Sequence, residues 1–122
     1  MKVLVVDDYA EVADSLAELL RAYGHEVETA YSGCAAVAEG ESWVPDLILM
    51  DVRLGGEDGC KVCKTMRSKP ALSSCRIVAM SGWEDDESGE WDRVFDGVLK
   101  KPIRLEVLEN VLSGENVPRA SH

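Results

Sequence analysis

Residues 3–8 read Val-Leu-Val-Val-Asp-Asp, and residues 45–51 read Pro-Asp-Leu-Ile-Leu-Met-Asp. In both stretches a short apolar run is followed directly by carboxylates. Continuous apolar runs of this kind are typical of strands that are buried on both faces of a parallel sheet. Carboxylates at the ends of such strands lie at the sheet edge where open α/β folds bind their ligands. These two stretches therefore decide the fold class and the place of the predicted site.

The hydrophobic pattern on either side of these stretches alternates between strand-like and helix-like periods. Further strands are predicted at 25–29, 76–80 and 96–100. Helices are predicted along 12–23, from 32 to 40, from 62 to 66, at 84–93 and along 105–112. Strands that alternate with helices in this way predict an α/β fold, in which a doubly wound parallel sheet carries helices on both faces and each crossover is right-handed.

The helical stripes also predict which side chains face the core. In the first helix the stripe consists of Val12, Leu16, Leu19, Leu20 and Tyr23, and Gly24 is placed to end that helix. In the last helix the stripe consists of Leu105, Leu108, Val111 and Leu112. Residues 1–113 are predicted to form one domain, and the polar residues 114–122 to form a flexible C-terminal tail.

Composition narrows the functional classes. The chain has 122 residues, of which 23 are acidic and 13 are basic, so its formal charge is −10. A surface this negative disfavours direct binding to nucleic acid or to anionic membranes. No targeting segment precedes the first strand and no apolar run is long enough to span a membrane, so the chain is predicted to be cytoplasmic. Its four cysteines are then expected to be reduced thiols.

Polar side chains follow four of the predicted strands. Asp7-Asp8 follow the first strand, Asp51 the third, Ser81 the fourth and Lys101 the fifth. Because the carboxyl ends of parallel strands meet at one edge of a sheet, these side chains are expected to converge. Each alone has an ordinary explanation, such as a helix cap for Asp8 or a turn for Ser81. Their joint placement makes a site the better interpretation.

The chemistry of this set is complementary. Crowded carboxylates repel one another, and a bound divalent cation relieves that repulsion. Mg²⁺ prefers oxygen ligands and keeps several waters, so a phosphoryl oxygen can join its coordination shell. A lysine and a hydroxyl are suited to the other phosphoryl oxygens, and one carboxylate is left to act as nucleophile. The residues therefore predict metal-assisted phosphoryl transfer to an aspartate.

Five stretches, taken in chain order, resemble the receiver domain of bacterial response regulators. They are residues 3–8, 45–51, 58–59, 77–82 and 99–102, and the resemblance extends over residues 1–113. It implies a flavodoxin-like receiver fold with five parallel strands in the order 2-1-3-4-5. It also implies a two-component response regulator, which is a phosphoacceptor signalling domain rather than an enzyme with a separate substrate.

The resemblance implies a role for each site residue. Asp51 would be the phosphoacceptor, and Ser81 and Lys101 would bind the phosphoryl group. The ligands of Mg²⁺, or of Mn²⁺ in its place, would be Asp7, Asp8, Asp51 and the backbone carbonyl of Arg53. The phosphodonor would be a sensor histidine kinase or a phosphotransfer protein. The output would be an unidentified downstream protein, and the resemblance also allows a phosphorylation-dependent homodimer.

Several positions depart from the family pattern. Gly55 replaces the usual proline four residues after the phosphoacceptor, which predicts a looser loop. Val98 replaces the usual aromatic residue, so the aromatic switch of many relatives cannot operate in its usual form. Arg53 and Trp83 lie two residues after the phosphoacceptor and the hydroxyl residue. The hypothesis that both side chains slow hydrolysis of the acyl phosphate stands beside the interpretation that both point to solvent.

The cysteines and tryptophans have simpler explanations. Cys60 and Cys63 have the spacing of a metal or redox motif, but no second pair or nearby histidine supports it. Core packing is therefore predicted for Cys63 and a flanking position for Cys60, while Cys34 is expected to be exposed. Trp43 and Trp91 are expected to cover the ends or faces of helices.

Three other functions remain as alternatives. A degenerate receiver would act as an interaction module without phosphorylation. An aspartyl-phosphate phosphatase or phosphotransferase commonly has a second acid two residues after its nucleophile, where this chain has Arg53. A flavodoxin-like cofactor binder would need a phosphate-binding loop after the first strand, where this chain has Asp7-Asp8.

Overall fold

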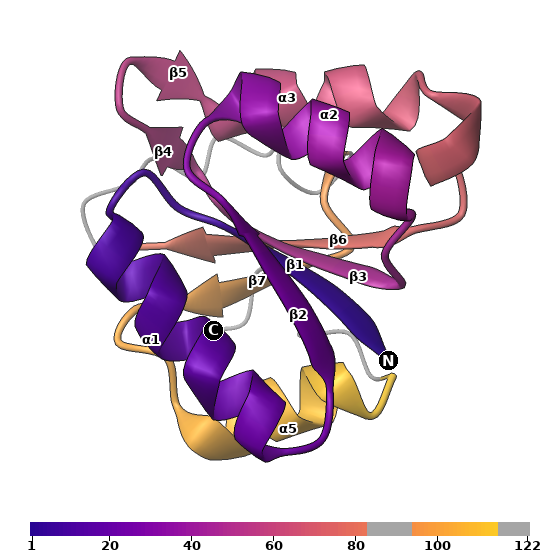
Figure 1. Cartoon of the computed structure of the whole chain (residues 1–122). Helices are drawn as coiled ribbons and strands as arrows, with labels where there is room; N and C mark the ends of the chain where they lie inside the picture. The colour runs from indigo at the N-terminus through magenta and orange to yellow at the C-terminus, as the bar shows by residue number, and fades with distance from the viewer. Residues whose placement is uncertain (83–93, 115–122) are drawn as a thin grey trace.

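The computed structural model describes residues 1–82 and 94–114 (Figure 1). Its elements are β1 (Lys2–Val6), α1 (Ala10–Ala22), β2 (Glu26–Ala30), α2 (Gly33–Trp43), β3 (Leu47–Asp51), β4 (Arg53–Leu54), β5 (Glu57–Asp58), α3 (Gly59–Arg67), the 3₁₀ turn η1 (Pro70–Leu72), β6 (Arg76–Ser81), β7 (Gly97–Lys100) and α5 (Leu105–Leu112). The predicted helix at 84–93, Trp91 and nearly all of the predicted tail lie outside the described residues. Among the described helices, none has the length and apolar character needed to cross a bilayer.

The main sheet has five parallel strands in the order β2-β1-β3-β6-β7. This arrangement confirms the predicted doubly wound fold and its strand order. In the register between β3 and β6, Asp51 pairs with Met80, and in the next pair Ser81 faces Lys100. The register of β3, β6 and β7 therefore brings Asp51, Ser81 and Lys101 to the same edge of the sheet.

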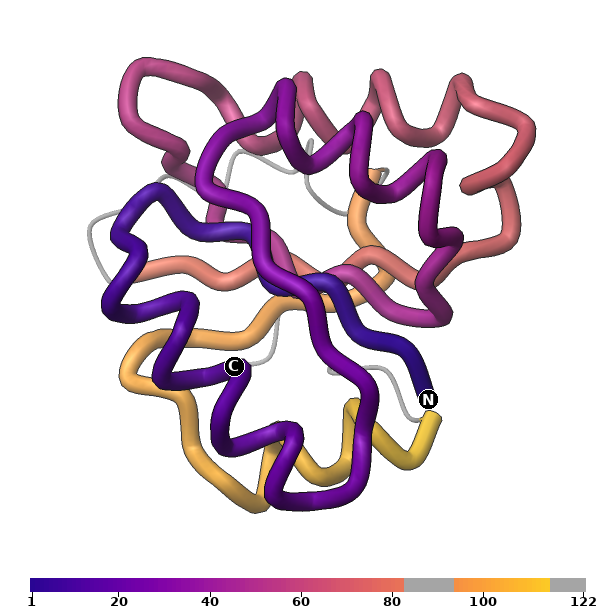
Figure 2. The backbone as a smooth tube through the Cα atoms, in the orientation of Figure 1, coloured from indigo at the N-terminus to yellow at the C-terminus, as the bar shows by residue number. Residues whose placement is uncertain are grey.

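The inner strands β1, β3 and β6 are buried on both faces because nearly all of their side chains are apolar, whereas the edge strand β2 alternates exposed and buried residues. In β1, Val3 and Val5 pack into the cluster that contains α1 and α5, whereas Leu4 and Val6 pack into the cluster that contains α2 and α3. The backbone trace shows the same layers, with α2 and α3 on one side of the sheet and α1 and α5 on the other (Figure 2). This two-sided burial explains the absence of polar alternation in the sequences of β1 and β3.

The buried face of α1 differs from the predicted stripe. Leu20 is fully buried as predicted, but the other buried residues of α1 are Ala13 and Ala17. Val12, Leu19 and Tyr23 are instead exposed, and so is Leu105 at the start of α5. The physical reason is that alanines allow the helix axis to approach the sheet closely, which turns the larger apolar side chains toward solvent. The prediction that Gly24 ends the helix is confirmed, because Gly24 has a φ of +95°.

Cys60 was predicted to flank the core, and this prediction is wrong. Its side chain is only 1% exposed and belongs to the same cluster as Cys63. Positions 60, 63 and 66 are three residues apart and so share one face of α3, which turns both cysteines toward the sheet. Burial raises the pKa of the Cys63 thiol to about 12, so this thiol stays protonated and unreactive at neutral pH. Cys34 is exposed as predicted, and Trp43 packs against the core from the end of α2.

A small antiparallel hairpin, β4–β5, follows β3 directly and was not predicted. Its turn is Gly55-Gly56, and Gly55 has a φ of +65°, which a proline cannot adopt. Two residues anchor the hairpin: Leu54 is 2% exposed in the core, and a carboxylate oxygen of Glu57 accepts a hydrogen bond of 2.8 Å from the Gly33 N–H at the start of α2. The Gly-Gly pair between two short runs was the sequence signal from which this hairpin could have been predicted.

Candidate functional site

Three carboxylates meet where β1 and β3 end. Asp51 is the last residue of β3, and Asp7 and Asp8 follow β1. One carboxylate oxygen from each of the three lies within 4.8 Å of the others. Asp7 is 1% exposed and Asp51 is 6% exposed, so two of these charges are almost removed from water. A cluster of this kind is costly for the folded chain unless positive charge compensates for it.

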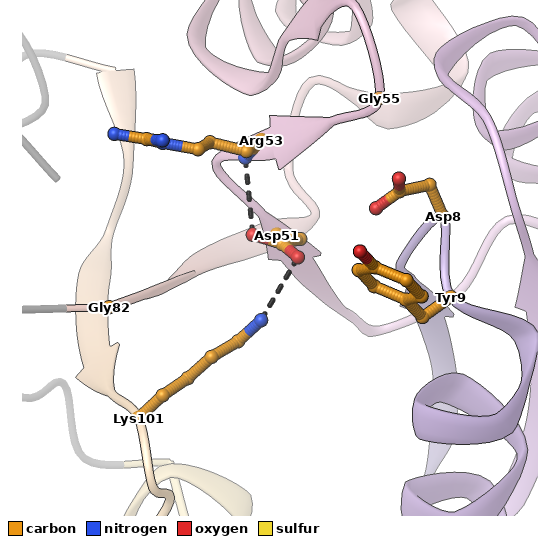
Figure 3. Close-up of a pocket in the computed structure, with 7 residues that line it drawn as sticks. All are labelled: Asp8, Tyr9, Asp51, Arg53, Gly55, Gly82 and Lys101. Carbon is orange, nitrogen blue, oxygen red and sulfur yellow. Dashed lines mark hydrogen bonds and ion pairs between the residues drawn. The ribbon is translucent and has the colours of Figure 1, made fainter. Parts of the chain in front are cut away.

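The side chain of Asp51 is held by two donors from different elements (Figure 3). The backbone N–H of Arg53 donates to its Oδ1 at 3.1 Å, and the ammonium group of Lys101 donates to its Oδ2 at 3.0 Å. The Lys101 Nζ also lies 3.6 Å from Oδ2 of Asp7. One lysine thus compensates part of the charge of two carboxylates and orients Asp51.

The backbone places Lys101 at this point. Its N–H donates to the carbonyl of Ser81 at 2.7 Å, which extends the β6–β7 pairing by one residue, and the peptide bond to Pro102 is cis. Burial alone would lower the pKa of Lys101, but the hydrogen bond and charge of Asp51 and the charge of Asp7 outweigh it and raise that pKa. Lys101 therefore remains a cation throughout the neutral range.

Among the residues that the structure describes, two buried polar atoms at the site find no hydrogen-bond partner. They are the hydroxyl oxygen of Ser81, which is fully buried, and Oδ2 of Asp7. Buried polar groups in folded proteins are nearly always paired, so unpaired ones at one sheet edge indicate that the site is built for another group. Clustered carboxylate oxygens suit a hard divalent cation, and a hydroxyl donor suits an anion.

A pocket of about 400 Å³ opens over the carboxylates. Its lining residues are Asp8, Tyr9, Asp51, Arg53, Gly55, Gly82 and Lys101. The structure thus brings together five of the six predicted site residues around one opening or directly beneath it, with Ser81 next in the chain to Gly82. Sequence reasoning missed Tyr9. The signal was its position directly after the two aspartates at a strand end, where a side chain is aimed at the sheet edge.

The family model for the response regulator receiver domain matches residues 3–113. The chain belongs to this family. The transcriptional regulatory protein TcrA of Mycobacterium tuberculosis is 32% identical to it over 108 residues, which is 88% of this chain and 43% of that protein. The receiver domain therefore spans less than half the length of this curated relative.

Solved structures of the family agree with the fold. A CheY-like receiver domain from Methylobacillus flagellatus has a TM-score of 0.86 and 30% identity, covering 93% of this chain and 96% of the other. The chemotaxis response regulator CheY4 of Vibrio cholerae has a TM-score of 0.82 and 30% identity, covering 92% and 95%. Receiver domains generally bind Mg²⁺ at an acidic pocket, and the aspartate cluster described above has the matching composition.

The structure places two of the residues that depart from the family pattern, Val98 and Arg53. Val98 is 4% exposed and packs in the core, so the aromatic position of many relatives is filled by a small buried side chain. Arg53 lines the pocket. Trp83 lies outside the described residues. The hypothesis that Arg53 and Trp83 together slow hydrolysis therefore stays a prediction.

Replacing Asp7 with asparagine should stabilise the receiver domain in the absence of metal. Burial, and then the charge of Asp51, raise the pKa of Asp7, while the hydrogen bond from the Tyr9 N–H partly opposes this shift. A carboxyl with a raised pKa stabilises the fold below its unfolded pKa, and that contribution is lost as the pH rises through the folded pKa. Asparagine keeps the oxygen that accepts from Tyr9 and carries no charge. We expect the free energy of unfolding at pH 7.5 to rise by about 1 kcal/mol.

This prediction is checked by urea unfolding in EDTA, with the wild type and Asp7→Asn compared at pH 7.5 and at pH 4.5. The advantage of the variant should shrink at the lower pH, where Asp7 of the wild type takes up a proton. Asp14→Asn, at an exposed position on α1, is the matched control. A variant that is less stable than the wild type at pH 7.5 would contradict the argument.

Proposed function

We propose that this receiver domain accepts a phosphoryl group on Asp51 from a phosphohistidine of a sensor histidine kinase or phosphotransfer protein. The observation that carries the proposal is the state of Asp51: it is nearly buried, held by Lys101 at 3.0 Å, and adjoined by two buried polar atoms that make no hydrogen bond within the described part of the chain. The contact with Lys101 makes Asp51 a positioned nucleophile. The two buried polar atoms offer places for an oxygen of a phosphoryl group and for a cation.

The side chains of Asp7, Asp8 and Asp51, with the backbone carbonyl of Arg53, are the ligands that would hold Mg²⁺ or Mn²⁺. Two observations support this assignment. The carboxylate oxygens lie within 4.8 Å of one another, and the buried Oδ2 of Asp7, 3.6 Å from Lys101 Nζ, makes no hydrogen bond to any described residue. When bound, the cation neutralises the carboxylates and stabilises negative charge on the phosphoryl oxygens. Three carboxylates and a carbonyl supply only oxygen atoms, which are the ligands that a hard cation such as Mg²⁺ prefers.

The residues of the chain divide the chemistry among them. A carboxylate oxygen of Asp51 attacks the phosphorus, the P–N bond to the donor imidazole breaks, and an acyl phosphate forms on Asp51. Lys101 then neutralises a phosphoryl oxygen from a position where it already contacts Asp51. The Ser81 hydroxyl, which makes no hydrogen bond to the described residues, donates to another phosphoryl oxygen. The Arg53 N–H keeps Asp51 oriented before attack.

The expected output is a change of partner rather than turnover of a substrate. Arg53 lines the pocket two residues after Asp51, where an aspartyl phosphatase would need an acid to activate water. The side chains of Tyr9, Val12, Leu19 and Tyr23 form an exposed stripe along α1 that begins at the pocket. Such a surface supports docking of a protein that donates the phosphoryl group. In this proposal the exchange takes place in the cytoplasm, and the signal passes to a downstream protein.

The test is incubation with acetyl phosphate in the presence of Mg²⁺ or of EDTA, followed by intact-mass measurement. We expect one phosphoryl group per chain with Mg²⁺ and none with EDTA. Beryllofluoride, which mimics a phosphoryl group on a carboxylate, should raise the unfolding temperature only when Mg²⁺ is present. A chain that takes up no phosphoryl group and shows no response to beryllofluoride would contradict the proposal and favour a degenerate receiver.

A further inference from the structure

We propose that the aromatic ring of Tyr9 binds the imidazole leaving group of the phosphodonor, which makes Tyr9 a specificity-determining residue for phosphohistidine. This inference rests on the proposed function, because it concerns the donor side of the same pocket. The composition of the pocket is the first observation that supports a role for Tyr9. Among the described residues, the others that line it are charged or are glycines: Asp8, Asp51, Arg53, Gly55, Gly82 and Lys101. Tyr9 therefore presents the neutral side-chain surface of this pocket.

The exposure of Tyr9 has no explanation in core packing. Its side chain is 70% exposed, more than that of any other large hydrophobic residue among those the structure describes. Figure 3 shows the ring beside Asp51 and Asp8, with its hydroxyl turned toward the carboxylates, on the side of the pocket opposite Arg53. An exposed aromatic ring at the mouth of a polar pocket is a typical recognition surface for an amphipathic ligand group.

The backbone of Tyr9 is anchored while its ring remains accessible. The Tyr9 N–H donates to Oδ1 of Asp7 at 3.0 Å, and its carbonyl accepts from the N–H groups of Val12 and Ala13 at 3.1 and 3.0 Å as α1 begins. The base of the side chain is thus tied to the same carboxylate cluster that surrounds Asp51. The point at which the ring is attached is therefore fixed beside the carboxylates, and the exposed ring itself is accessible to a ligand at the mouth.

The chemistry of transfer places the leaving group near this ring. As the bond from an Asp51 oxygen to phosphorus forms, the P–N bond breaks, and its electron pair remains on the ring nitrogen, which then takes a proton from solvent. The phosphoryl oxygens are drawn inward by Lys101, so the imidazole lies outward, toward the mouth. There the face of Tyr9 offers stacking to a neutral ring and cation–π attraction to a protonated one. The acetate that leaves acetyl phosphate is an anion and gains nothing from the negative face of an aromatic ring.

The test compares two small donors, N-phosphoimidazole and acetyl phosphate, with Mg²⁺ and intact-mass measurement of the phosphorylation rate. Tyr9→Ala and Tyr9→Leu should lower the second-order rate constant with N-phosphoimidazole about fivefold, which corresponds to about 1 kcal/mol, and leave the rate with acetyl phosphate unchanged. Tyr9→Phe should keep the wild-type rate with both donors. Tyr23→Ala removes a tyrosine that is also exposed, at the far end of α1, and should have no effect.

Each outcome bears on a separate claim. An equal fall with both donors would assign Tyr9 to the shape of the mouth and overturn the inference, as would an unchanged rate with N-phosphoimidazole. A loss in Tyr9→Phe as large as that in Tyr9→Ala would assign the effect to the hydroxyl and also overturn it. Tyr9→Leu keeps much of the bulk of the side chain without the aromatic ring. It therefore replaces Tyr9→Ala in the comparison if Tyr9→Ala folds poorly. A wild type that accepts from neither donor overturns the proposed function itself.

Discussion

Asp51→Asn should take up no phosphoryl group from acetyl phosphate under conditions in which the wild type is fully modified. Asparagine keeps the shape of the side chain and an oxygen for the Arg53 N–H, which donates to Oδ1 of Asp51 at 3.1 Å. It lacks the anionic oxygen that attacks phosphorus, and an amide oxygen is a far weaker nucleophile. The expected effect is therefore a complete loss of the adduct, seen by intact mass, in a protein that is still folded.

A matched control makes this result specific to the site. Asp14→Asn changes an exposed aspartate of α1 in the same way, and should leave phosphoryl uptake at the wild-type level. Removal of Asp51 also leaves Lys101 without the hydrogen bond at 3.0 Å that helps to raise its pKa. Uptake of a phosphoryl group by Asp51→Asn would show that another side chain is the acceptor, and would contradict the assignment of Asp51.

Gly59→Ala should destabilise the receiver domain by roughly 3 kcal/mol. A Cβ at this position would lie 2.6 Å from the carbonyl oxygen of Asp51 and 2.8 Å from the Cα of Val52. Both are backbone atoms, so no side chain can rotate away, and the start of α3 must move from the end of β3. The Gly59 N–H also donates to the carbonyl of Val52 at 2.8 Å, and this bond would be lost or stretched.

Gly56→Ala is the matched control, because nothing lies within 4 Å of a Cβ built at Gly56 in the hairpin turn. Urea unfolding of the two variants should give a much lower midpoint for Gly59→Ala and a midpoint near that of the wild type for Gly56→Ala. Since the clash involves Asp51 itself, phosphoryl uptake by folded Gly59→Ala should also be slower. Equal stability of the two variants would show that the contact between α3 and β3 is looser than described.

The fold could be predicted from the sequence because its inner strands are apolar on both faces. The stretch Val3–Val6 and the stretch Leu47–Met50 bury every side chain, a pattern that a strand with one exposed face would not show. Alternation with helices then leaves few topologies, since parallel strands need right-handed crossovers. The strand order itself came from resemblance to a family, because hydrophobic periodicity does not state which strands are neighbours.

The sequence was less informative about helix faces. In α1 the larger apolar residues were predicted to face the core, but Ala13 and Ala17 do so, and Val12 and Leu19 are exposed. Hydrophobicity alone ranks valine and leucine above alanine, whereas the distance between helix and sheet favours the smaller side chain. The same limitation applies to Cys60, whose burial depends on how α3 packs against β3 and β4.

What the sequence determined by itself was the inventory of the site: carboxylates after the first and third strands, a hydroxyl after the fourth and a lysine after the fifth. Residue type and position after a strand are local properties, and they suffice to predict convergence at one sheet edge. Only the tertiary structure decided which atoms meet. It paired Lys101 with Asp51 and placed Tyr9 at the mouth. It also left Oδ2 of Asp7 and the Ser81 hydroxyl without a hydrogen bond among the described residues. These contacts join residues far apart in the chain, and they depend on strand register and on how closely each helix packs against the sheet.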